Sequence, residues 1–326
     1  MARILSGMRP TGKLHLGHLH GALHNWISLT SEYECFYFAA DWHALTSEYE
    51  DTSTIAPHTR DMVIDWLAAG LDPEKCTIFV QSQVKAHTEL ALIFGMITPL
   101  PWLLKNPSFK DQQENILEKD LNTFGFLGYP VLQAADILIY RAHGVPVGED
   151  QSAHVELSRA IGKRFNHIFG EVFPLPKEIL TPTPRVPGTD GRKMSKSYGN
   201  AVLLSDPPDL VSQKIRTMVT DPARQRRTDP GDPDICPVFD LHRVYSDEET
   251  KDWVRKGCAT AGIGCLDCKK PLIEAINQEL APIQERRAEL EADETLVDRI
   301  LEAGNAKARQ EAEATMAEVR KVLQFG

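Results

Sequence analysis

Two histidines stand three residues apart in the stretch PTGKLHLGH, residues 10–18, just after a short apolar run. In an open α/β sheet, ligands bind at the carboxyl ends of the strands, where the free N–H groups of a helix N-terminus favour anions. His15 and His18 on one helical face could donate hydrogen bonds to phosphate oxygens, and Gly17 has no side chain to keep a nucleotide off the backbone. Taken alone, the stretch is equally consistent with a polar helix start that carries two surface histidines.

A second stretch, GRKMSKS at residues 191–197, combines two lysines with two serines. Lys193 and Lys196, with Ser195 and Ser197 beside them, could close over a triphosphate and offset the charge that develops on a pyrophosphate leaving group. The alternative is an ordinary solvated basic loop. The sequence contains no GxxxxGKS or GxxxxGKT motif that would provide a different phosphate site.

Four of the six cysteines are closely spaced in the last third of the chain. They are Cys236, Cys258, Cys265 and Cys268. Four thiolates that converge on one centre fit either a zinc site with four cysteine ligands or a 4Fe–4S cluster. The alternative is that these cysteines are small buried hydrophobic residues. Six cysteines in 326 residues are too few for a disulfide-dense protein.

The overall charge is acidic, with a formal net charge of −10, which argues against broad, non-specific affinity for nucleic acid. Local basic runs occur near the cysteines, at residues 223–227 and 269–270. No stretch approaches the roughly 18 apolar residues that a membrane-spanning helix needs, and the N-terminal apolar run meets polar residues too soon for a secretory signal. We therefore expect a cytoplasmic protein with no membrane partner.

The elements that must position these residues alternate between strand and helix patterns over the first half of the chain. Apolar runs at residues 3–8, 34–45 and 76–82 predict buried strands, and two of them place Cys35 and Cys76 in the core. Amphipathic segments between the strands predict helices. This alternation favours an α/β fold in which helices cover both faces of a parallel sheet.

Beyond about Asn200 the pattern becomes helical, and strand-like runs almost vanish. The sequence thus predicts a sheet domain at residues 1–200 and a helical domain at residues 201–326. Residues 220–234 are rich in Pro and Asp, and we expect them to form an ordered loop between helices.

The pair of motifs resembles the paired signatures of class I aminoacyl-tRNA synthetases. The segments SGMRPTGKLHLGHLHGAL, ADWHALT, YPVLQAADILIYRAHGVPVGEDQ and RKMSKS stand in the order and spacing of the tryptophan and tyrosine branch of that class. The resemblance runs over essentially the whole chain and is to bacterial tryptophanyl-tRNA synthetases. It implies a Rossmann-like, doubly wound catalytic domain at residues 1–200 and an all-helical anticodon-binding domain at residues 201–326.

The resemblance implies a ligase reaction in two steps. The carboxylate of L-tryptophan would attack the α-phosphate of ATP, pyrophosphate would leave with its Mg²⁺, and the tryptophanyl group would pass to tRNA(Trp). The implied catalytic residues are His15, His18, Lys193 and Lys196. The residues implied in ATP binding are Arg9, Pro10, Thr11, Gly17, His18, Gly148, Glu149, Asp150, Gln151, Val186, Lys193, Met194, Ser195, Lys196 and Ser197.

The residues implied in tryptophan binding are Leu5, Gly7, His43, Tyr129, Gln133, Asp136, Val147 and Gln151. Asp136 would accept a hydrogen bond from the indole N–H, a group that can only donate. Gln133 matches the Gln of tyrosine enzymes, whereas tryptophan enzymes often carry Met there. Leu5 favours tryptophan, because tyrosine enzymes tend to carry a Tyr there and an unpaired buried hydroxyl costs about 1–3 kcal/mol. A tyrosyl-tRNA synthetase and a non-charging regulator that binds tryptophan or RNA are the remaining alternatives.

By the same resemblance, the four cysteines match a subgroup of tryptophanyl-tRNA synthetases whose helical domain holds a 4Fe–4S cluster, with a structural zinc ion as the alternative. Such a centre would fix loops that present basic side chains to the anticodon stem of tRNA. The implied tRNA contacts are Arg224, Arg226, Arg227, Lys269 and Lys270. A homodimer is also implied, since residues 103–112 resemble the family's segment near the subunit contact.

Overall fold

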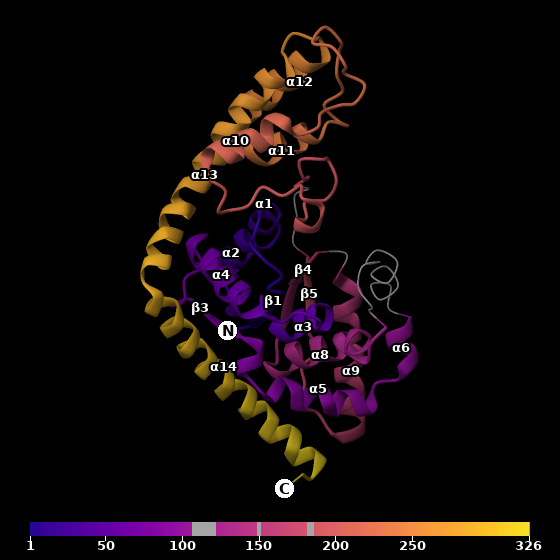
Figure 1. Cartoon of the computed structure of the whole chain (residues 1–326). Coiled ribbons are helices and arrows are strands. Elements are labelled where there is room, and N and C mark those ends of the chain that lie inside the picture. The colour runs from indigo at the N-terminus through magenta and orange to yellow at the C-terminus, as the bar shows by residue number, and fades with distance from the viewer. Residues whose placement is uncertain (106–121, 149–150, 181–185, 326) are drawn as a thin grey trace.

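The computed structural model describes residues 1–105, 122–148, 151–180 and 186–325. At its centre lies a five-stranded sheet in the order β3-β2-β1-β4-β5 (Figure 1). The strands are β1 (Arg3–Met8), β2 (Glu34–Ala39), β3 (Cys76–Val80), β4 (Gly144–Val147) and β5 (Lys177–Leu180). Every pairing between them is parallel. The chain moves outward from β1 to β3 and then crosses to the other side of β1, which confirms the predicted doubly wound α/β fold.

Helices cover both faces of this sheet. In the N-terminal half they are α1 (Leu16–His18), the π-helix η1 (Leu19–Leu23), α2 (His24–Leu29), α3 (Asp41–Glu48), α4 (Ile55–Ala68), α5 (Ala86–Ile97), α6 (Leu100–Leu104), α8 (Phe124–Ile139) and α9 (Ser152–Phe169). Alternate side chains of a doubly covered strand enter two cores. Cys35 and Tyr37 of β2 pack with α2 and α4, whereas Phe36 and Phe38 pack with α5, α8 and α9. Cys35 lies opposite Cys76 of β3 in the register of the sheet, and both are buried, as predicted.

The second predicted strand is shorter than expected. β2 ends at Ala39, and α3 begins at Asp41. The Asp41 carboxylate accepts the backbone N–H of Trp42 at 3.1 Å and that of Ser82 at 2.9 Å. An acidic side chain in the first turn stabilises the positive end of a helix, and here it also ties that end to the segment after β3. The residues that follow Ala39 therefore continue as a helix.

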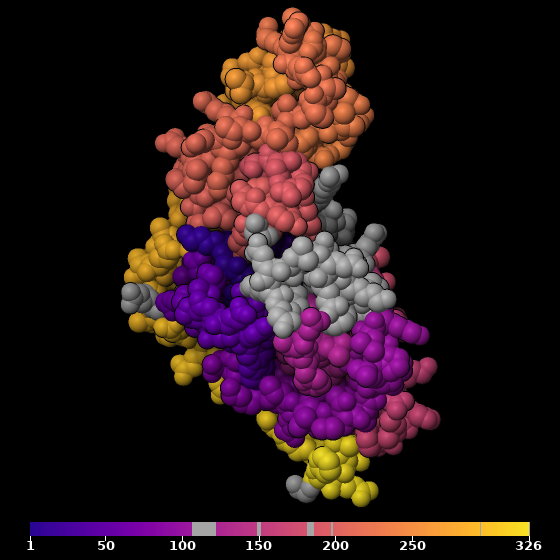
Figure 2. Space-filling model, turned by 45° about the vertical axis from the view of Figure 1, so that its right-hand side comes forward, coloured from indigo at the N-terminus to yellow at the C-terminus, as the bar shows by residue number. Residues whose placement is uncertain are grey.

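The chain after residue 200 is helical, as predicted. Its helices are α10 (Pro208–Thr217), α11 (Pro237–Tyr245), α12 (Glu248–Ala259), α13 (Cys265–Ala292) and α14 (Glu294–Leu323). Figure 1 shows α10, α11 and α12 gathered at one end of the molecule, and in Figure 2 this orange part stands above the indigo and purple body. Residues 218–236 form turns between α10 and α11 without a strand. None of the described helices is long and apolar enough to cross a bilayer.

The last helix, α14, returns to the sheet and runs along its β3 edge (Figure 1). The helix backbone approaches the strand so closely that a Cβ on Gly304 would lie 1.8 Å from the carbonyl oxygen of Ile78. Asn305 accepts the backbone N–H of Val80 at 2.9 Å, which satisfies a donor on the edge strand. Met316 is buried in the same core cluster as the sheet. All five strands lie before the predicted boundary near Asn200, and the chain after it is helical. The core of the sheet domain nevertheless includes side chains of the C-terminal helix.

Candidate active site

A cavity of about 300 Å³ lies at the carboxyl ends of the central strands, where the strand order reverses. Open α/β sheets bind their ligands at this place. The cavity is lined by seven of the eight residues predicted for tryptophan: Leu5, Gly7, His43, Tyr129, Gln133, Asp136 and Gln151. The eighth, Val147, packs against the core instead, and Val145 of the same strand faces the cavity.

Apolar and aromatic side chains form much of the cavity wall. The Phe38 ring lies across β1 at Gly7, where a Cβ would sit 2.4 Å from the ring, so that only glycine leaves room for it. Leu5 is 1% exposed and adds an aliphatic surface. Phe38, Phe126 and His154 also line the cavity, and sequence analysis missed them because they stand outside any motif. This lining suits a flat apolar ligand held by a few polar groups.

Asp136 is the polar centre of the cavity. It lies on α8, is 1% exposed, and accepts three hydrogen bonds. Its Oδ2 is 2.7 Å from Nε2 of His43, and its Oδ1 is 2.6 Å from Nδ1 of His87 and 2.8 Å from Nε2 of Gln81. Burial raises the pKa of a carboxyl, but here the hydrogen bonds from His43 and His87 outweigh burial and lower the pKa of Asp136 to about 2. The group is therefore ionised and can only accept.

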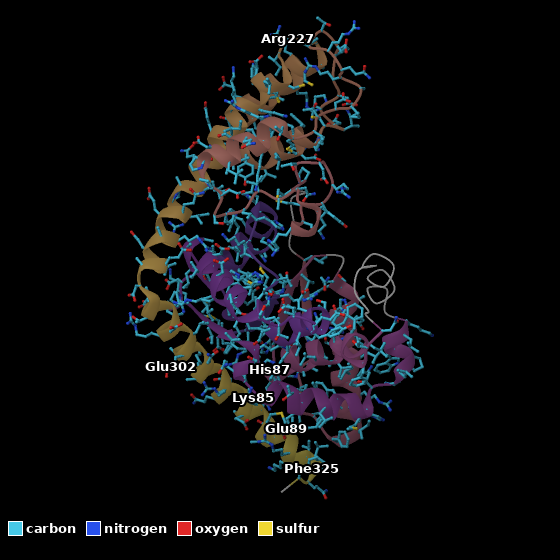
Figure 3. All side chains as sticks on the ribbon, viewed as in Figure 1. Lys85, His87, Glu89, Arg227, Glu302 and Phe325 are labelled. Carbon is cyan, nitrogen blue, oxygen red and sulfur yellow. The ribbon has the colours of Figure 1, made fainter. Side chains whose placement is uncertain are left out.

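Sequence analysis missed three residues that form hydrogen bonds to Asp136 or to its partner His87. Gln81 stands in the 3₁₀ turn η2 (Gln81–Gln83), and His87 stands in the first turn of α5. Tyr140 follows α8, and its hydroxyl lies 2.8 Å from Nε2 of His87. His87, labelled in Figure 3, is fully buried. The only sequence signal for these three residues is polarity within apolar surroundings.

His15 and His18 meet where the chain leaves β1. His15 is the N-cap of α1, and its Nδ1 accepts the backbone N–H of Gly17 at 3.1 Å. Nδ1 of His18 accepts the backbone N–H of His15 at 3.2 Å, and the two ring centroids lie 3.8 Å apart. Because both Nδ1 atoms accept, the neutral rings carry their protons on Nε2. Each imidazole therefore keeps an N–H donor for a ligand.

The loop that carries KMSKS lies against the same helix start. The backbone N–H of Leu16 donates to the carbonyl oxygen of Val202 at 3.0 Å, which ties the segment after the loop to the HLGH motif. Asn200 is buried inside the loop, accepts the N–H of Ser195 at 2.8 Å and donates to the carbonyl oxygen of Lys193 at 3.2 Å. The fold thus brings the two motifs together although they are far apart in the sequence.

The charges of the two motifs act on one another. Nζ of Lys196 lies 3.2 Å from the place that a Cβ on Gly12 would take, in the turn before HLGH. Burial, followed by the charge of Lys196, lowers the pKa of His15 to about 4. Burial, then His15 and the two lysines Lys196 and Lys193, lowers the pKa of His18 well below its usual value. The charges of both lysines therefore act on the pair of neutral histidines.

The structure describes most of the remaining residues predicted for ATP binding. Arg9 and Gln151 line the cavity. Of the others that the structure describes, Gly17 lies in HLGH, Met194 and Ser195 lie in KMSKS, Gly148 follows β4, and the rest lie before one of the two motifs: Pro10, Thr11 and Val186. Glu149 and Asp150 lie outside the described residues, as does the side chain of Ser197.

The chain is similar to known proteins. A family model for class I tRNA synthetases of the W and Y type matches residues 1–281. The chain is 56% identical over 324 residues to the tryptophan–tRNA ligase of Thermotoga maritima, with 98% of each chain covered. It is similar to the crystal structure of tryptophanyl-tRNA synthetase from Campylobacter jejuni complexed with ADP and tryptophan, with a TM-score of 0.88, 32% identity, and 99% and 100% of the two chains covered.

The chain belongs to the bacterial tryptophanyl-tRNA synthetases of class I. A further relative, the tryptophan–tRNA ligase of Deinococcus radiodurans, is 46% identical over 330 residues and covers 100% of this chain and 99% of its own. The synthetase is accordingly an aminoacyl-tRNA ligase.

The four clustered cysteines of the synthetase stand at helix ends. Cys236 is the N-cap of α11, Cys258 lies in the last turn of α12, and Cys265 and Cys268 lie in the first turn of α13. Burial, and then the other three thiols, raises the pKa of Cys268 to about 12, so the four sulfurs are near enough to affect one another. No three of these described sulfurs lie within 4.8 Å of one another.

Polar groups and open space adjoin these thiols. Sγ of Cys258 accepts an N–H of Arg224 at 3.6 Å, and Sγ of Cys268 lies 3.4 Å from Nε2 of His242. A Cβ on Gly231 would lie 2.7 Å from Sγ of Cys258, so glycine keeps space free beside that sulfur. Hydrogen-bond donors next to sulfur are typical of the surroundings of thiolate metal centres.

Two of the five predicted tRNA contacts lie inside the helical part. Arg224 is 8% exposed and donates to the carbonyl oxygens of Arg227 and Ile263. Lys269 is 3% exposed, and its ammonium donates to the backbone carbonyl oxygens of Arg216, near the end of α10, and of Met218, just after that helix. Both side chains thus connect backbone segments of the helical part, and both are buried. The other three, Arg226, Arg227 and Lys270, are exposed, and Figure 3 shows Arg227 at the far tip of the molecule.

Proposed function

We propose that the synthetase joins L-tryptophan to ATP in the cavity around Asp136 and then transfers the tryptophanyl group to tRNA(Trp). The observation that carries this proposal is the meeting of the HLGH and KMSKS side chains beside an aromatic-lined cavity with an ionised, buried carboxylate. Amino-acid-dependent exchange of pyrophosphate into ATP tests it. Exchange with tryptophan is expected, and a protein that shows none would be a non-charging regulator.

Asp136 is proposed to recognise the indole N–H. An ionised carboxylate has about four acceptor positions, and three are used by His43, His87 and Gln81 among the described residues. One position on Oδ2 is left for a donor in the cavity. A donor-only group such as the indole N–H fits an acceptor-only partner, and a charged acceptor strengthens the bond.

Tryptophan is favoured over tyrosine by the wall of the cavity. Leu5 offers no partner to a phenol hydroxyl, and an unpaired buried hydroxyl costs about 1–3 kcal/mol. Gln133 also lines the cavity and is the feature that favours tyrosine. The relatives with curated function are tryptophan–tRNA ligases. Exchange assays with both amino acids separate these readings, since a tyrosine enzyme would reverse the preference.

The adenylation step is proposed to depend on position and charge. A carboxylate oxygen of tryptophan bonds to the α-phosphorus of ATP, the bond from that phosphorus to the bridging oxygen breaks, and pyrophosphate leaves with its Mg²⁺. The Nε2–H groups of His15 and His18 donate to phosphate oxygens, and the ammonium groups of Lys193 and Lys196 offset charge on the leaving group. No protein nucleophile is needed.

The four cysteines are proposed to hold a 4Fe–4S cluster, with zinc as the alternative. The four thiols stand at the ends of α11, α12 and α13, and Arg224 and His242 adjoin two of their sulfurs, which supports a thiolate centre there. When bound, the cluster would cross-link the ends of α11, α12 and α13. Iron, zinc and sulfide analysis of anaerobically purified protein tests this: about four iron atoms per chain support the cluster, and one zinc atom overturns it.

The helical part at residues 201–326 is proposed to dock the anticodon stem of tRNA. The exposed cations Arg226, Arg227 and Lys270 offer a local basic surface on an acidic protein, which suits binding at one place. Replacing Arg226 and Arg227 together with glutamine tests this. The Michaelis constant for tRNA should rise, while pyrophosphate exchange without tRNA stays unchanged.

A homodimer is proposed from the apolar surface near the predicted subunit contact. Residues 106–112 of that segment lie outside the described residues. Beside it, α5, α6 and the start of α8 expose large apolar side chains: Leu92, Met96, Leu100, Leu104 and Phe124. Clustered exposed apolar residues are typical of interaction sites. Sedimentation equilibrium tests this, and Met96→Lys should shift the protein toward monomer.

A further inference from the structure

Three potential metal ligands meet away from the cavity, at the junction between the sheet domain and the helical part. His20 lies in η1, His24 begins α2, and Glu279 lies on α13. Nε2 of His20 is 3.1 Å from one carboxylate oxygen of Glu279, and Nε2 of His24 is 3.6 Å from the other. The three ligand atoms all lie within 4.8 Å of one another.

We propose that His20, His24 and Glu279 form a site for one divalent metal ion of the zinc class. Two imidazoles and a carboxylate are a ligand set that zinc uses, with bonds of about 2.0–2.2 Å. Ligand atoms around such a tetrahedral ion lie about 3.3 Å apart. The separations of 3.1 and 3.6 Å, each to a different oxygen of Glu279, lie near this value, and the full set within 4.8 Å would have to contract by side-chain rotation to hold one ion.

The backbone supports this convergence. His20 and His24 are four residues apart on consecutive helical turns, so their side chains share one helix face. Their rings meet edge to face, with centroids 4.8 Å apart and planes at 86°. Edge-to-face rings can direct their lone pairs to a common point, whereas stacked rings cannot. Both rings face α13, from which Glu279 projects.

A neighbouring hydroxyl completes the surroundings of the site. The Tyr245 hydroxyl at the end of α11 lies 2.8 Å from Nε2 of His20 and is also hydrogen-bonded to Glu279. With an ion on Nε2, the hydroxyl would donate to the carboxylate and orient it, as outer partners of metal sites do. The side chain of His20 is 10% exposed, that of Glu279 27% and that of His24 44%. An ion can therefore enter beside His24, and water can supply a fourth ligand there.

Such an ion would connect parts of the molecule that carry different tasks. η1 begins directly after His18, the last residue of the HLGH motif. Glu279 belongs to α13, whose first turn carries Cys265 and Cys268. The ion would therefore fix the segment after the phosphate-binding histidines against the helix that leads to the cysteines. A metal ion that binds the folded state in preference to the unfolded state stabilises the protein, so the melting temperature should rise with added zinc.

Cobalt titration of the full-length protein, as purified anaerobically and freed of loosely bound ions, tests the site. Co²⁺ at this site should give visible d–d absorption with one equivalent bound, and without the sulfur-to-cobalt charge-transfer band that binding to thiolates gives. His24→Gln should weaken binding at least about ten-fold, and Tyr245→Phe about 10- to 100-fold, the loss typical of outer partners. His167→Gln, on the exposed end of α9, is the matched control and should bind as the unmodified protein does.

Two outcomes would overturn the site. One is Co²⁺ or Zn²⁺ binding that is equally strong in the unmodified protein and in His24→Gln. The other is a spectrum dominated by sulfur charge transfer, which would assign the ion to the cysteines. His24→Gln alters a half-exposed side chain and is expected to fold, so the test does not depend on the more buried Glu279→Gln.

Discussion

His87 lies between Asp136 and Tyr140, with Nδ1 2.6 Å from Oδ1 of the carboxylate and Nε2 2.8 Å from the phenol hydroxyl. A neutral imidazole in this position donates from Nδ1 to the carboxylate and accepts the hydroxyl proton at Nε2, so both contacts select one tautomer. This chain of buried groups holds the carboxylate ionised, and Asp136 itself lines the cavity. Asp136 on α8 is thus positioned by a residue of α5.

Asp136→Asn should weaken tryptophan binding about 10- to 150-fold, because hydrogen bonds to charged groups contribute about 1.5–3 kcal/mol. The dissociation constant, measured by calorimetry or by quenching of protein fluorescence, checks this. Tyr140→Phe is the matched control: it removes the far hydroxyl of the chain, should cost about 1 kcal/mol of unfolding free energy, and should leave the dissociation constant nearly unchanged. Unaltered tryptophan affinity in a folded Asp136→Asn protein would remove the carboxylate from recognition.

Lys196→Ala should lower the rate of adenylate formation by about 10²- to 10³-fold, the usual effect of deleting one group that stabilises developing charge. Tryptophan affinity should change little, since the ammonium of Lys196 lies beside the turn before HLGH and Lys196 does not line the cavity. Pre-steady-state pyrophosphate exchange measures the first quantity and calorimetry the second. Lys163→Ala, an exposed lysine on α9, is the control. Equal losses in rate and in tryptophan affinity would contradict a role in the transition state.

Acid should destabilise the synthetase in part through His15. The pKa of His15 is about 4 in the folded chain, against 6.5 in the unfolded chain. Below pH 6.5 the unfolded chain therefore takes up a proton that the folded chain excludes, and stability falls as the pH falls from 6.5 towards 4, by up to about 3 kcal/mol.

Urea unfolding at a series of pH values measures this loss. His15→Asn keeps a good N-cap residue but has no group that titrates in this range, so its stability should fall less steeply with acid. Equal slopes for both proteins between pH 6.5 and 4 would show that His15 does not carry the effect.

Cys265→Ser should remove the proposed metal centre, because three remaining thiolates no longer complete a four-ligand site. Charging of tRNA should fall at least about ten-fold, as the loops of the helical part lose their cross-link, while exchange without tRNA should stay near its normal rate. Metal analysis and the two assays check these expectations. Cys35→Ala, in the core of β2, should keep its metal. An exchange reaction that is abolished in a folded Cys265→Ser protein would contradict this separation of tasks.

Gly304→Ala should destabilise the protein by at least about 3 kcal/mol, because the new Cβ would lie 1.8 Å from a backbone oxygen of β3 and α14 would have to move. Gly95→Ala in α5 is the matched control, since nothing lies within 4 Å of its Cβ position. Within a helix this change should stabilise by about 0.5–1 kcal/mol. Urea unfolding of both variants measures the difference, and similar stabilities would show that α14 is not closely docked.

Features that depend on residues close together in the sequence could be predicted from it. The alternation of apolar runs and amphipathic segments was enough for the parallel sheet, and the two motifs were enough to name residues that the fold brings together around His15. The loop predicted at residues 220–234, which the structure extends to 218–236, and the core positions of Cys35 and Cys76 were also predictable, since each depends on nearby residues.

Contacts between distant segments were not predictable. Nothing in the sequence links Gln81, His87 and Tyr140, because their shared partner is defined only by the packing of α5 and α8. The same limit applies to Arg224 and Lys269, whose basic character suggested RNA although the fold turns both inward to backbone carbonyls. From the sequence alone, a charged residue that binds a ligand cannot be distinguished from one that forms hydrogen bonds to its own chain.

The docking of α14 on β3 has a consequence for how the protein is made. A ribosome delivers α14 after all of the sheet, so the outer strand keeps its edge open to other chains during synthesis. The aromatic core on one face of the sheet also remains incomplete until Met316 and its neighbours have been synthesised and can pack against it. Folding of the nucleotide-binding half therefore finishes only after translation of the last helix, and nascent chains that stall within α14 should be prime substrates for chaperones and proteases.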